Sequence, residues 1–332
     1  MTEVKKRPLE GLLYDREGFR MSTPKEIASY LAERLAGGTV ADIGCGIGVQ
    51  TISFAERSER VVAVDMNRER LEMCRKNCER MNLGNVDFIL GDALSKSVVA
   101  RVGDVNIVHS DPSRVRTGRW SMDSLSPNPL LVSREYDGDK CFDLPALMPQ
   151  SEIPKGWEME FISLGGELKR LCAYTGDLKI YEKSALSLPQ GARVVYDMEI
   201  DRKVEIASKP LHFIYDVDAS ISVSGLLPEF LSSNVELRII HEDSQRTLAT
   251  SSVPADNPFI ARKYEVMGEA VSLTDLRKKI EEMDAGKVYL RFSVEPSKYY
   301  ELKGRLERGL RGSSSAYIFR FGDRFYAAAK AQ

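Results

Sequence analysis

The segment VADIGCGIGVQTISFA, residues 40–55, places three glycines between an apolar strand pattern and a helical pattern. Because Gly44, Gly46 and Gly48 have no side chain, the backbone can turn tightly at these positions and approach a ligand closely. The dinucleotide fingerprint G-x-G-x-x-G requires glycine at position 49, where this chain has Val49. The spacing G-x-G-x-G therefore predicts a ligand-binding loop that differs from a dinucleotide site.

Three carboxylates stand close to the ends of successive predicted strands. Asp42 lies two residues before the first glycine, where a carboxylate attracts a ligand ammonium group and repels a pyrophosphate. Asp65, in VVAVDMN, is placed to accept from both hydroxyls of a ribose, and Asp92, in ILGDAL, is placed to accept from an adenine amino group. The three acids together predict S-adenosylmethionine as the cofactor. The alternative is ordinary turn chemistry, because Asp and Gly are common where strands end.

These residues require a sheet that brings strand ends together. From residue 24 to residue 111 the sequence alternates helical periodicity with short apolar runs, a pattern typical of repeated βα units and a parallel sheet. The predicted helices span residues 24–35, 49–57 and 68–81, and the predicted strands span residues 39–43, 61–64, 86–90 and 105–109. Strands at 141–144, 159–164 and 168–174 complete a sheet of about seven strands.

The second part of the chain has a different pattern. The segment SLPQGARV, residues 187–194, predicts a boundary between a domain over residues 1–188 and a domain over residues 189–332. Beyond it, short strands are predicted at 193–200, 235–240, 288–293 and 316–321, and helices near 226–232 and 272–282. This mixture predicts a smaller α+β domain.

Composition limits the function classes. A chain of 332 residues fits two domains, and its formal net charge of −2 gives no overall attraction to nucleic acid, so such binding requires a local patch. No apolar run approaches the roughly 20 residues that span a bilayer, and the first residues lack the apolar region of a signal peptide, so we expect a cytoplasmic protein. The five cysteines show no CxxC pair, which predicts reduced thiols and no metal site.

The glycine loop and the three acids resemble those of class I S-adenosylmethionine-dependent methyltransferases, over about Gly11 to Gly176. The resemblance implies an α/β, Rossmann-like, seven-stranded, mostly parallel sheet with helices on both faces. The segment DREGFRMSTPKEIASYLAERL is similar to RNA guanine-N2 methyltransferases of the trimethylguanosine synthase type. In that group an aromatic residue and Ser/Thr-Pro help to close over the cofactor, which implies this role for Phe19, Ser22, Thr23 and Pro24. For Phe19 a hydrophobic staple at the helix start is the alternative. The predicted cofactor-binding residues are Phe19, Thr23, Asp42, Gly44, Cys45, Gly46, Gly48, Asp65, Met66, Asp92 and Ala93.

The predicted catalytic residues are Asp111, Pro112, Ser113 and Arg114, at the end of the fourth strand. In class I amino-methyltransferases this position carries D/N-P-P-aromatic. A carboxylate and a backbone carbonyl that accept from an exocyclic amine restore its lone pair as a nucleophile, which fits Asp111 and Pro112. Ser113 and Arg114 depart from the pattern, and Arg114 can stack through its guanidinium plane or hold a phosphate. The alternative is a polar loop in which Asp111 caps backbone amides.

The rest of the chain is similar to methyltransferases with a C-terminal THUMP-like domain. The stretches that carry this resemblance are EFISLGGELKRLCAYTGDL, IYDVDASISVSGLLPEFL and ELKGRLERGL. THUMP domains bind RNA, so the resemblance implies an RNA partner, either tRNA or rRNA. Arg114, Arg116 and Arg119 lie beside the predicted methyl site and favour a phosphate-bearing substrate. Residues 287–332 hold ten Lys/Arg against four Asp/Glu, which suits local RNA docking, with a solvated helix face as the alternative.

The sequence thus predicts an S-adenosylmethionine-dependent methyltransferase that acts on a base nitrogen in RNA. Two alternatives are a small-molecule methyltransferase whose C-terminal domain is a lid, and a non-catalytic RNA-binding protein on the same fold. Carbon-5 methylation through a Cys141 nucleophile is disfavoured, because KCFDLPALMP lacks the expected proline partner. The histidines, His109, His212 and His241, are scattered, which favours core or surface roles.

Overall fold

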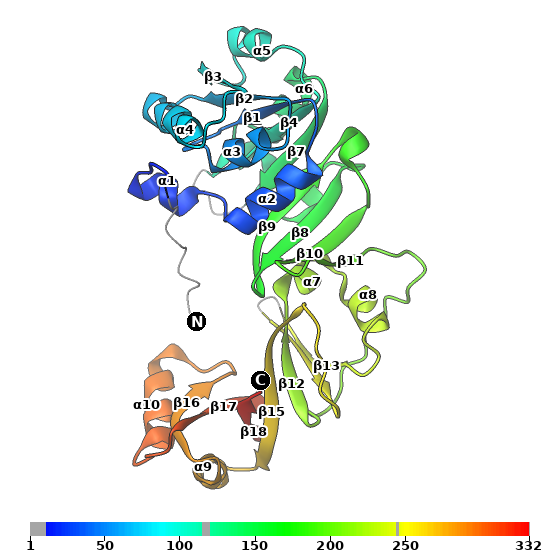
Figure 1. Ribbon diagram of the computed structural model, residues 1–332. Helices are drawn as coiled ribbons and strands as arrows, with labels where there is room; N and C mark the ends of the chain where they lie inside the picture. Colours follow the sequence, from blue (N-terminus) through cyan, green and yellow to red (C-terminus); the bar gives the residue numbers. More distant parts are fainter. Residues whose placement is uncertain (1–10, 115–119, 244–245, 332) are drawn as a thin grey trace. The chain divides into compact units, whose positions relative to one another are not determined.

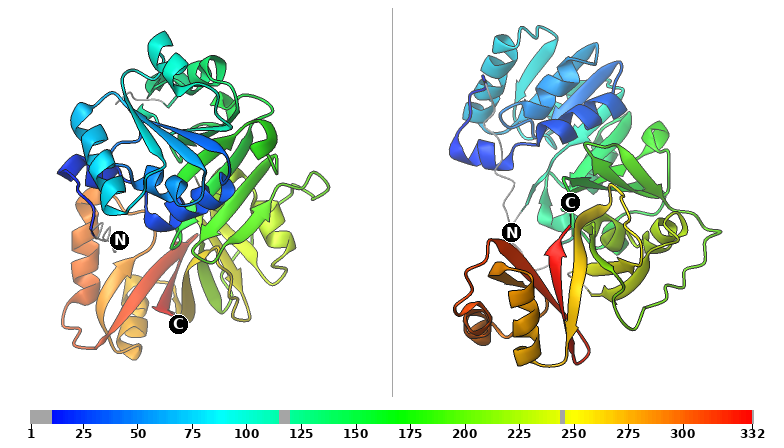
Figure 2. Two further views of the ribbon diagram at one scale, coloured as in Figure 1. Left: turned by 45° about the horizontal axis from the view of Figure 1, so that its top comes forward. Right: turned by 60° about the horizontal axis from the view of Figure 1, so that its bottom comes forward.

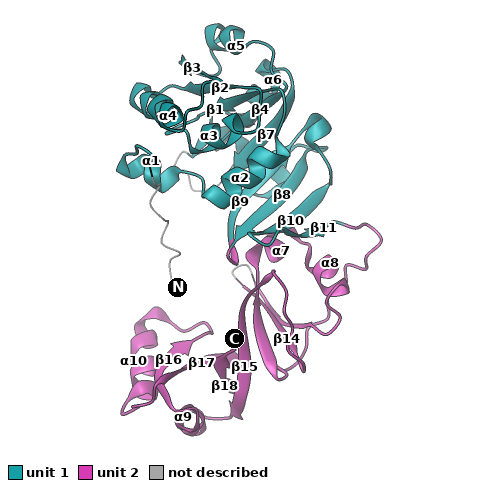
Figure 3. Cartoon of the chain, in the orientation of Figure 1, with its two compact units in different colours: residues 1–164, 168–196 teal, residues 165–167, 197–332 magenta. Residues whose placement is uncertain are grey.

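The computed structural model describes residues 11–114, 120–243 and 246–331, so Arg116 and Arg119 of the predicted phosphate-binding set lie outside the described residues. The chain divides into two compact units (Figure 3). The first contains residues 1–164 and 168–196, and the second contains residues 165–167 and 197–332. Within the described ranges, no helix combines the length and apolar character needed to cross a membrane.

The first unit is built on a nine-stranded sheet (Figure 1). Its strands are, in spatial order, β11 (Ala192–Val195), β10 (Lys183–Leu188), β8 (Glu158–Leu164), β9 (Glu167–Tyr174), β7 (Asp139–Leu144), β4 (Ile107–Ser110), β1 (Thr39–Ile43), β2 (Arg60–Asp65) and β3 (Val86–Leu90). The pairs β1·β2, β1·β4, β2·β3, β4·β7 and β8·β10 are parallel, whereas β7·β9 and β10·β11 are antiparallel. The first four strands in chain order therefore end at one edge.

The helices of the first unit are α1 (Arg16–Met21), α2 (Lys25–Arg34), α3 (Val49–Ala55), α4 (Arg68–Arg80), α5 (Lys96–Val102) and α6 (Pro129–Glu135). Short 3-10 turns occupy Met122–Ser124, Gln150–Glu152 and Gly176–Leu178, and a two-stranded ribbon pairs β5 (Ser113–Arg114) with β6 (Leu125–Ser126). Helices α2, α3 and α4 lie together on one face of the sheet (Figure 2). Side-chain caps begin four helices: Asp15 at α1, Asn67 at α4, Ser95 at α5 and Asn128 at α6.

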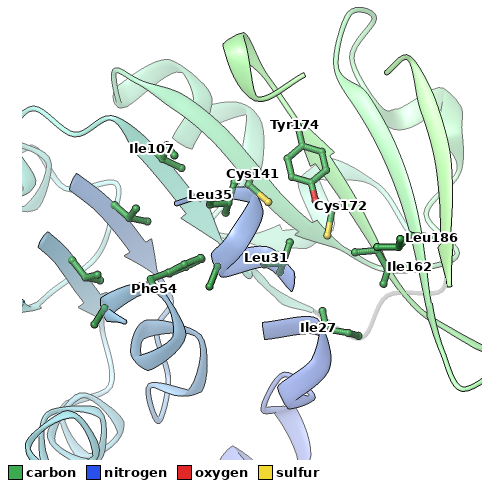
Figure 4. Close-up of a cluster of buried hydrophobic side chains, with 14 of the residues drawn as sticks. Ile27, Leu31, Leu35, Phe54, Ile107, Cys141, Ile162, Cys172, Tyr174 and Leu186 are labelled. Carbon is green, nitrogen blue, oxygen red and sulfur yellow. The ribbon is translucent and has the colours of Figure 1, made fainter. Parts of the chain in front are cut away.

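The core under α2 joins helix and sheet residues that are far apart in the chain (Figure 4). Ile27 and Leu31 of α2 and Phe54 of α3 pack against Ile107 of β4 and neighbouring strand residues, all buried. Cys141 and Cys172 lie in the same cluster as small buried side chains. The proposed nucleophile of the carbon-5 alternative is thus fully inside the core, which removes it from contact with a substrate.

The second unit is a seven-stranded sheet with four helices. Its strand order is β13 (Arg238–Glu242), β14 (Thr247–Ser251), β12 (Phe213–Val217), β15 (Ile260–Ala270), β18 (Arg324–Lys330), β17 (Ser314–Phe321) and β16 (Ala285–Leu290). The helices are α7 (Ala219–Ser224), α8 (Leu227–Ser232), α9 (Leu273–Glu282) and α10 (Pro296–Glu307). Leu276 and Ile280 of α9 and Leu306 of α10 pack on one face of this sheet, against Val288 and Ile318.

The structure differs from the sequence-based expectation in both units, and in the second unit β12, β14, β15, β18, α7 and α10 were not predicted. The first sheet has nine strands instead of seven, because β10 and β11 extend it beyond β8. The strand predicted at 193–200 is β11, which pairs with β10 and so remains in the first unit, past the predicted boundary at 188/189. Helices α5 and α6, each seven residues long, were not predicted, although α3 of the same length was.

A buried ion network ties α2 to the far half of the first sheet. Nη2 of Arg34 lies 2.7 Å from Oε1 of Glu158, and Nη1 lies 3.0 Å from Oε1 of Glu160. The Arg34 side chain is 6% exposed and both carboxylates are fully buried. The hydroxyl of Tyr30 donates to Glu160 at 2.8 Å. This network compensates the burial of two acids, which would otherwise be strongly unfavourable.

We predict that Arg34→Met lowers the free energy of unfolding by about 3–5 kcal/mol, because it leaves buried carboxylates without their shared cation. The matched control is Arg57→Met, since Arg57 pairs with Glu33 on the surface, where such a pair contributes about 0–1 kcal/mol. Urea unfolding followed by circular dichroism measures both. Equal losses in the two variants would contradict the assignment.

Candidate active site

A pocket of about 980 Å³ lies in the first unit, where the loops after β1, β2, β3 and β4 meet. In open parallel sheets, ligands bind at this edge because the loops and helix starts there leave a crevice. The wall also includes the segment between α1 and α2 and one residue of β9, Arg170. One pocket thus joins the predicted cofactor loops to the predicted catalytic loop.

The glycine loop owes its course to backbone conformations that side chains rarely adopt. Gly44 has φ +82°, and a Cβ there would lie 3.2 Å from the carbonyl oxygen of Asp111. Gly48 has φ +89°, and a Cβ there would lie 2.5 Å from Sγ of Cys74. The loop therefore passes close to the catalytic loop on one side and to α4 on the other, with its backbone open to the pocket.

The three predicted cofactor acids differ in their surroundings. Asp42 is buried, and its carboxylate accepts from Thr51 at 2.5 Å and contacts His109 at 2.9 Å. Asp65 accepts from the amide of Gly46 at 2.8 Å and from the amide of Asn67 at 2.7 Å. Asp92 is exposed and accepts from its own turn. Asp65 therefore stabilises the conformation of the glycine loop and also lines the pocket.

The pocket brings most of the predicted residues together. Its wall contains the predicted cofactor-binding residues Thr23, Asp42, Gly44, Cys45, Gly46, Asp65, Met66, Asp92 and Ala93, and the predicted catalytic residues Asp111, Pro112, Ser113 and Arg114. Two other described residues, Phe19 and Gly48, are not on the wall. The ring of Phe19 instead lies 5.2 Å from the ring of Tyr14, whereas its neighbours Gly18 and Arg20 do line the pocket.

The predicted catalytic loop, residues 111–114, forms one end of the pocket. Asp111 follows β4 directly and its side chain is 32% exposed, while Pro112 is buried. Ser113 and Arg114 form β5, which pairs with β6 and so holds the loop beside Trp120. The guanidinium carbon of Arg114 lies 5.9 Å from the Trp120 ring centre. The motif D/N-P-P-aromatic has its aromatic residue where this chain has Arg114. In the structure Trp120, six residues later in the chain, places an aromatic ring beside that position.

A chain of mostly buried charges runs along the wall of this pocket. His109 contacts Asp42 through Nδ1, and Asp143 of β7 through Nε2 at 3.2 Å. Arg170 of β9 pairs with Asp143, lies 3.7 Å from a carboxylate oxygen of Asp111, and donates to Thr23 at 3.2 Å. Negative and positive groups alternate from Asp42 to Asp111. Each inner charge therefore has an opposite charge on both sides, which makes burial tolerable.

The position of His109 favours its charged form. Burial alone lowers its pKa, but the hydrogen bond and the negative charge of Asp42 more than offset this, so the pKa is raised above its usual range. The ring of Phe54 meets His109 edge-on, with ring centres 5.1 Å apart. The raised pKa thus favours the imidazolium form of His109, which lies between the carboxylates of Asp42 and Asp143.

Sequence reasoning missed His109, Asp143, Arg170 and Trp120. A signal was present for two of them, because Asp143 and Arg170 are charged residues inside apolar strands and such residues require partners. His109, Cys141 and Asp143 place potential metal ligands within 4.8 Å of one another. The Arg170 guanidinium forms an ion pair with the Asp143 carboxylate and would repel a metal cation there. We therefore interpret His109, Asp143 and Arg170 as an ion-pair network.

Comparisons with known proteins agree with this geometry. Residues 40–114 match the family described as Methyltransferase domain. An uncharacterized S-adenosylmethionine-dependent methyltransferase of Mycobacterium tuberculosis is 27% identical over 226 residues, which are 66% of this chain and 61% of that protein. The chain thus spans about three-fifths of the length of this relative. A probable cobalt-precorrin-6B C(15)-methyltransferase of Methanobrevibacter smithii is 34% identical over 59 residues, 18% of this chain and 32% of that protein.

The crystal structure of a putative methyltransferase from Porphyromonas gingivalis W83 has a similar fold across both units. It aligns with a TM-score of 0.75 and 17% identity, and covers 96% of this chain and 83% of that one. The predicted α/β methyltransferase fold is therefore confirmed. The first unit has the fold of methyltransferase domains, and its residues 40–114 match the family model of one. The predicted enzyme class, an S-adenosylmethionine-dependent methyltransferase, and the predicted cofactor are confirmed for this domain.

We predict that His109 stabilises the protein in a pH-dependent way. Because its folded-state pKa is raised, its contribution is fully present below about pH 6.5 and is lost as the pH rises through the folded-state value. The unfolding free energy of the wild type minus that of His109→Gln should therefore be largest near pH 6 and shrink towards pH 9.

Chemical denaturation across this pH range measures the difference. His241→Gln is the matched control, because the ion pair of His241 with Asp243 is exposed and contributes little. A difference for His109→Gln that grows with pH would contradict the imidazolium assignment.

Proposed function

We propose that the protein transfers the methyl group of S-adenosylmethionine to a base nitrogen in RNA. The observation that carries this proposal is the end of the pocket, where the partly exposed carboxylate of Asp111 lies in the same wall as Arg114 and the indole of Trp120. A carboxylate accepts from an exocyclic amine, and an indole offers a stacking surface to a base. This combination suits a planar amine-bearing acceptor.

The cofactor residues fit S-adenosylmethionine by their chemistry. Asp42, Asp65 and Asp92 make this end of the pocket acidic, which suits a cation and hydroxyl donors and disfavours phosphates. At Gly44 a Cβ would fill the space between the two loops, so the bare backbone leaves a cradle for a ligand. When bound, the cofactor supplies an activated methyl group on its sulfonium.

The chain's own residues then align the acceptor. Arg170 lies 3.7 Å from a carboxylate oxygen of Asp111 and orients this carboxylate, so that its oxygens can accept from the amine. Arg170 is itself fixed by Asp143 and Thr23. The backbone carbonyl of Pro112 is the second acceptor in the proposal, because proline restricts the turn that directs it. Alignment of this kind is the main requirement when the electrophile is already activated.

The RNA partner, either tRNA or rRNA, is supported by the second unit. Its similarity to THUMP-like domains, and that of residues 15–35 to guanine-N2 methyltransferases, favours RNA. Arg305, Arg308 and Arg311 are exposed near the end of α10, and no ion pair joins them to a carboxylate in the described part of the chain. Such exposed guanidiniums are available for phosphates, as are Arg114, Arg116 and Arg119 in the proposal.

The decisive experiment uses RNA from cells that lack this gene. The purified protein is incubated with this RNA and methyl-labelled S-adenosylmethionine, and nucleosides are analysed by mass spectrometry. We predict label in a base-methylated nucleoside and a fall in rate of about 100-fold or more for Asp111→Asn, which loses the charge that accepts from the amine. Cofactor affinity, measured by calorimetry, should be unchanged.

The matched control for Asp111→Asn is Asp104→Asn, an exposed carboxylate that is not part of the pocket wall. Label only in small molecules would favour the alternative of a metabolite acceptor. Failure to bind the cofactor would favour a non-catalytic RNA-binding protein. Equal rates for the two variants would remove Asp111 from the mechanism.

We also predict that Arg305→Glu, Arg308→Glu and Arg311→Glu, combined in one variant, weaken RNA binding without changing cofactor affinity. If each arginine meets one phosphate, the salt slope of the affinity should fall by about 2. The control combines Lys96→Glu, Arg101→Glu and Lys155→Glu, exposed residues of the first unit with the same change in charge. Equal weakening in both variants would show a general charge effect and contradict docking at α10.

A further inference from the structure

The second unit contains a cluster of three arginines around one aspartate. Asp216 of β12 is 7% exposed, and its carboxylate lies 2.5 Å from the guanidinium of Arg246, 2.5 Å from that of Arg291 and 3.4 Å from that of Arg262. The hydroxyl of Tyr264 approaches the same carboxylate at 3.3 Å. The four charged residues come from β12, β15 and the segments beside β14 and β16, so the fold assembles them.

The cluster has more positive than negative charge. Three guanidiniums share one carboxylate, and no second carboxylate forms an ion pair with any of them in the described ranges. The arginine side chains are only 22%, 40% and 26% exposed for Arg246, Arg262 and Arg291. Burial, together with the charge of Arg291, lowers the pKa of Arg246 despite the opposing effect of Asp216. Two net positive charges on partly buried side chains are unfavourable, and a bound anion would stabilise them.

Aromatic rings hold two of these arginines in place. The guanidinium of Arg246 lies 5.4 Å from the ring centre of Phe319, and that of Arg291 lies 5.8 Å from the ring centre of Tyr264. Nε of Arg291 is buried and donates to no other atom of the described chain. A fixed cluster with an unused donor requires little reorganisation on binding, which favours affinity.

The cluster also lies on a sheet face away from two of the unit's helices. Tyr264 and Phe319 belong to the apolar cluster of one face, whereas α9 and α10 pack on the residues of the other. Arg262 is in the same strand as Tyr264, two residues earlier, and so points to the same face. The exposed part of the cluster is therefore formed mainly by Arg262.

We propose that Arg246, Arg262 and Arg291 form a binding site for a phosphate group. Guanidinium groups present planar pairs of N–H donors that match phosphate oxygens, and Asp216 spaces them and reduces their mutual repulsion. The phosphate belongs either to an RNA strand or to a small phosphorylated molecule. The site is distinct from the exposed arginines of α10 and does not depend on methyl transfer.

The experiment compares Arg262→Gln with the wild-type protein, because Arg262 is the most exposed of the three and makes the longest contact with Asp216. The probes are a labelled oligouridylate, followed by fluorescence anisotropy, and inorganic phosphate and pyrophosphate, followed by calorimetry. We expect Arg262→Gln to weaken binding of at least one probe about tenfold, the loss of one charge-assisted contact. Arg262→Lys should recover part of this loss.

The matched control is Arg324→Gln, an exposed arginine of the same sheet that pairs with Glu269 and carries the same charge change. Loss with oligouridylate alone identifies an RNA phosphate, and loss with the small anions identifies a small phosphorylated ligand. Wild-type binding to none of the probes, or equal weakening by Arg262→Gln and Arg324→Gln, would overturn the proposal. Calorimetry with S-adenosylmethionine separates this outcome from a failure of the methyltransferase assignment.

Discussion

The imidazole ring of His109, held between the carboxylates of Asp42 and Asp143, joins the two halves of the pocket. Asp42 stands at the end of β1 beside the glycine loop, and Asp143 lies in β7 and pairs with Arg170, which faces Asp111. Because all the inner members are buried, none of these charges is stable without the next. The position of the acceptor carboxylate is thus tied to the cofactor loop through the sheet itself.

This arrangement also determines the charge that the pocket presents. When His109 is protonated, Asp42, Asp143 and Asp111 carry three negative charges against the two positive charges of His109 and Arg170, so one negative charge remains. Asp111 is the member of the five that is about a third exposed, so this charge meets the pocket there. The network therefore orients a single carboxylate at the end of the pocket where we propose that the acceptor binds. A cationic cofactor and an amine acceptor both suit such an electrostatic environment.

The local parts of the site could be predicted from the sequence, because short segments determine them. The glycine loop follows from backbone conformation at Gly44, and strands 39–43 and 86–90 follow from apolar runs bounded by turns. The network could not be predicted, because His109, Asp143 and Arg170 lie on three strands whose pairing is set by the whole sheet. Trp120 was missed for a related reason: the β5·β6 ribbon, rather than sequence adjacency, brings it to Arg114.

Buried charges are balanced within the first unit and unbalanced within the second. We relate this difference to function: the first network positions a side chain, and the second cluster is proposed to bind a ligand. In the first unit, acids and bases alternate, so every inner cation has two anionic neighbours and needs no further partner. Around Asp216 there are three arginine cations and one carboxylate. The ring of Phe319 packs against one of these guanidiniums, that of Arg246. An alternating chain is complete within the protein and therefore serves to orient Asp111. The cluster around Asp216 has excess positive charge, and its partly buried guanidiniums have lost part of their water, which is why we propose that an external anion completes it.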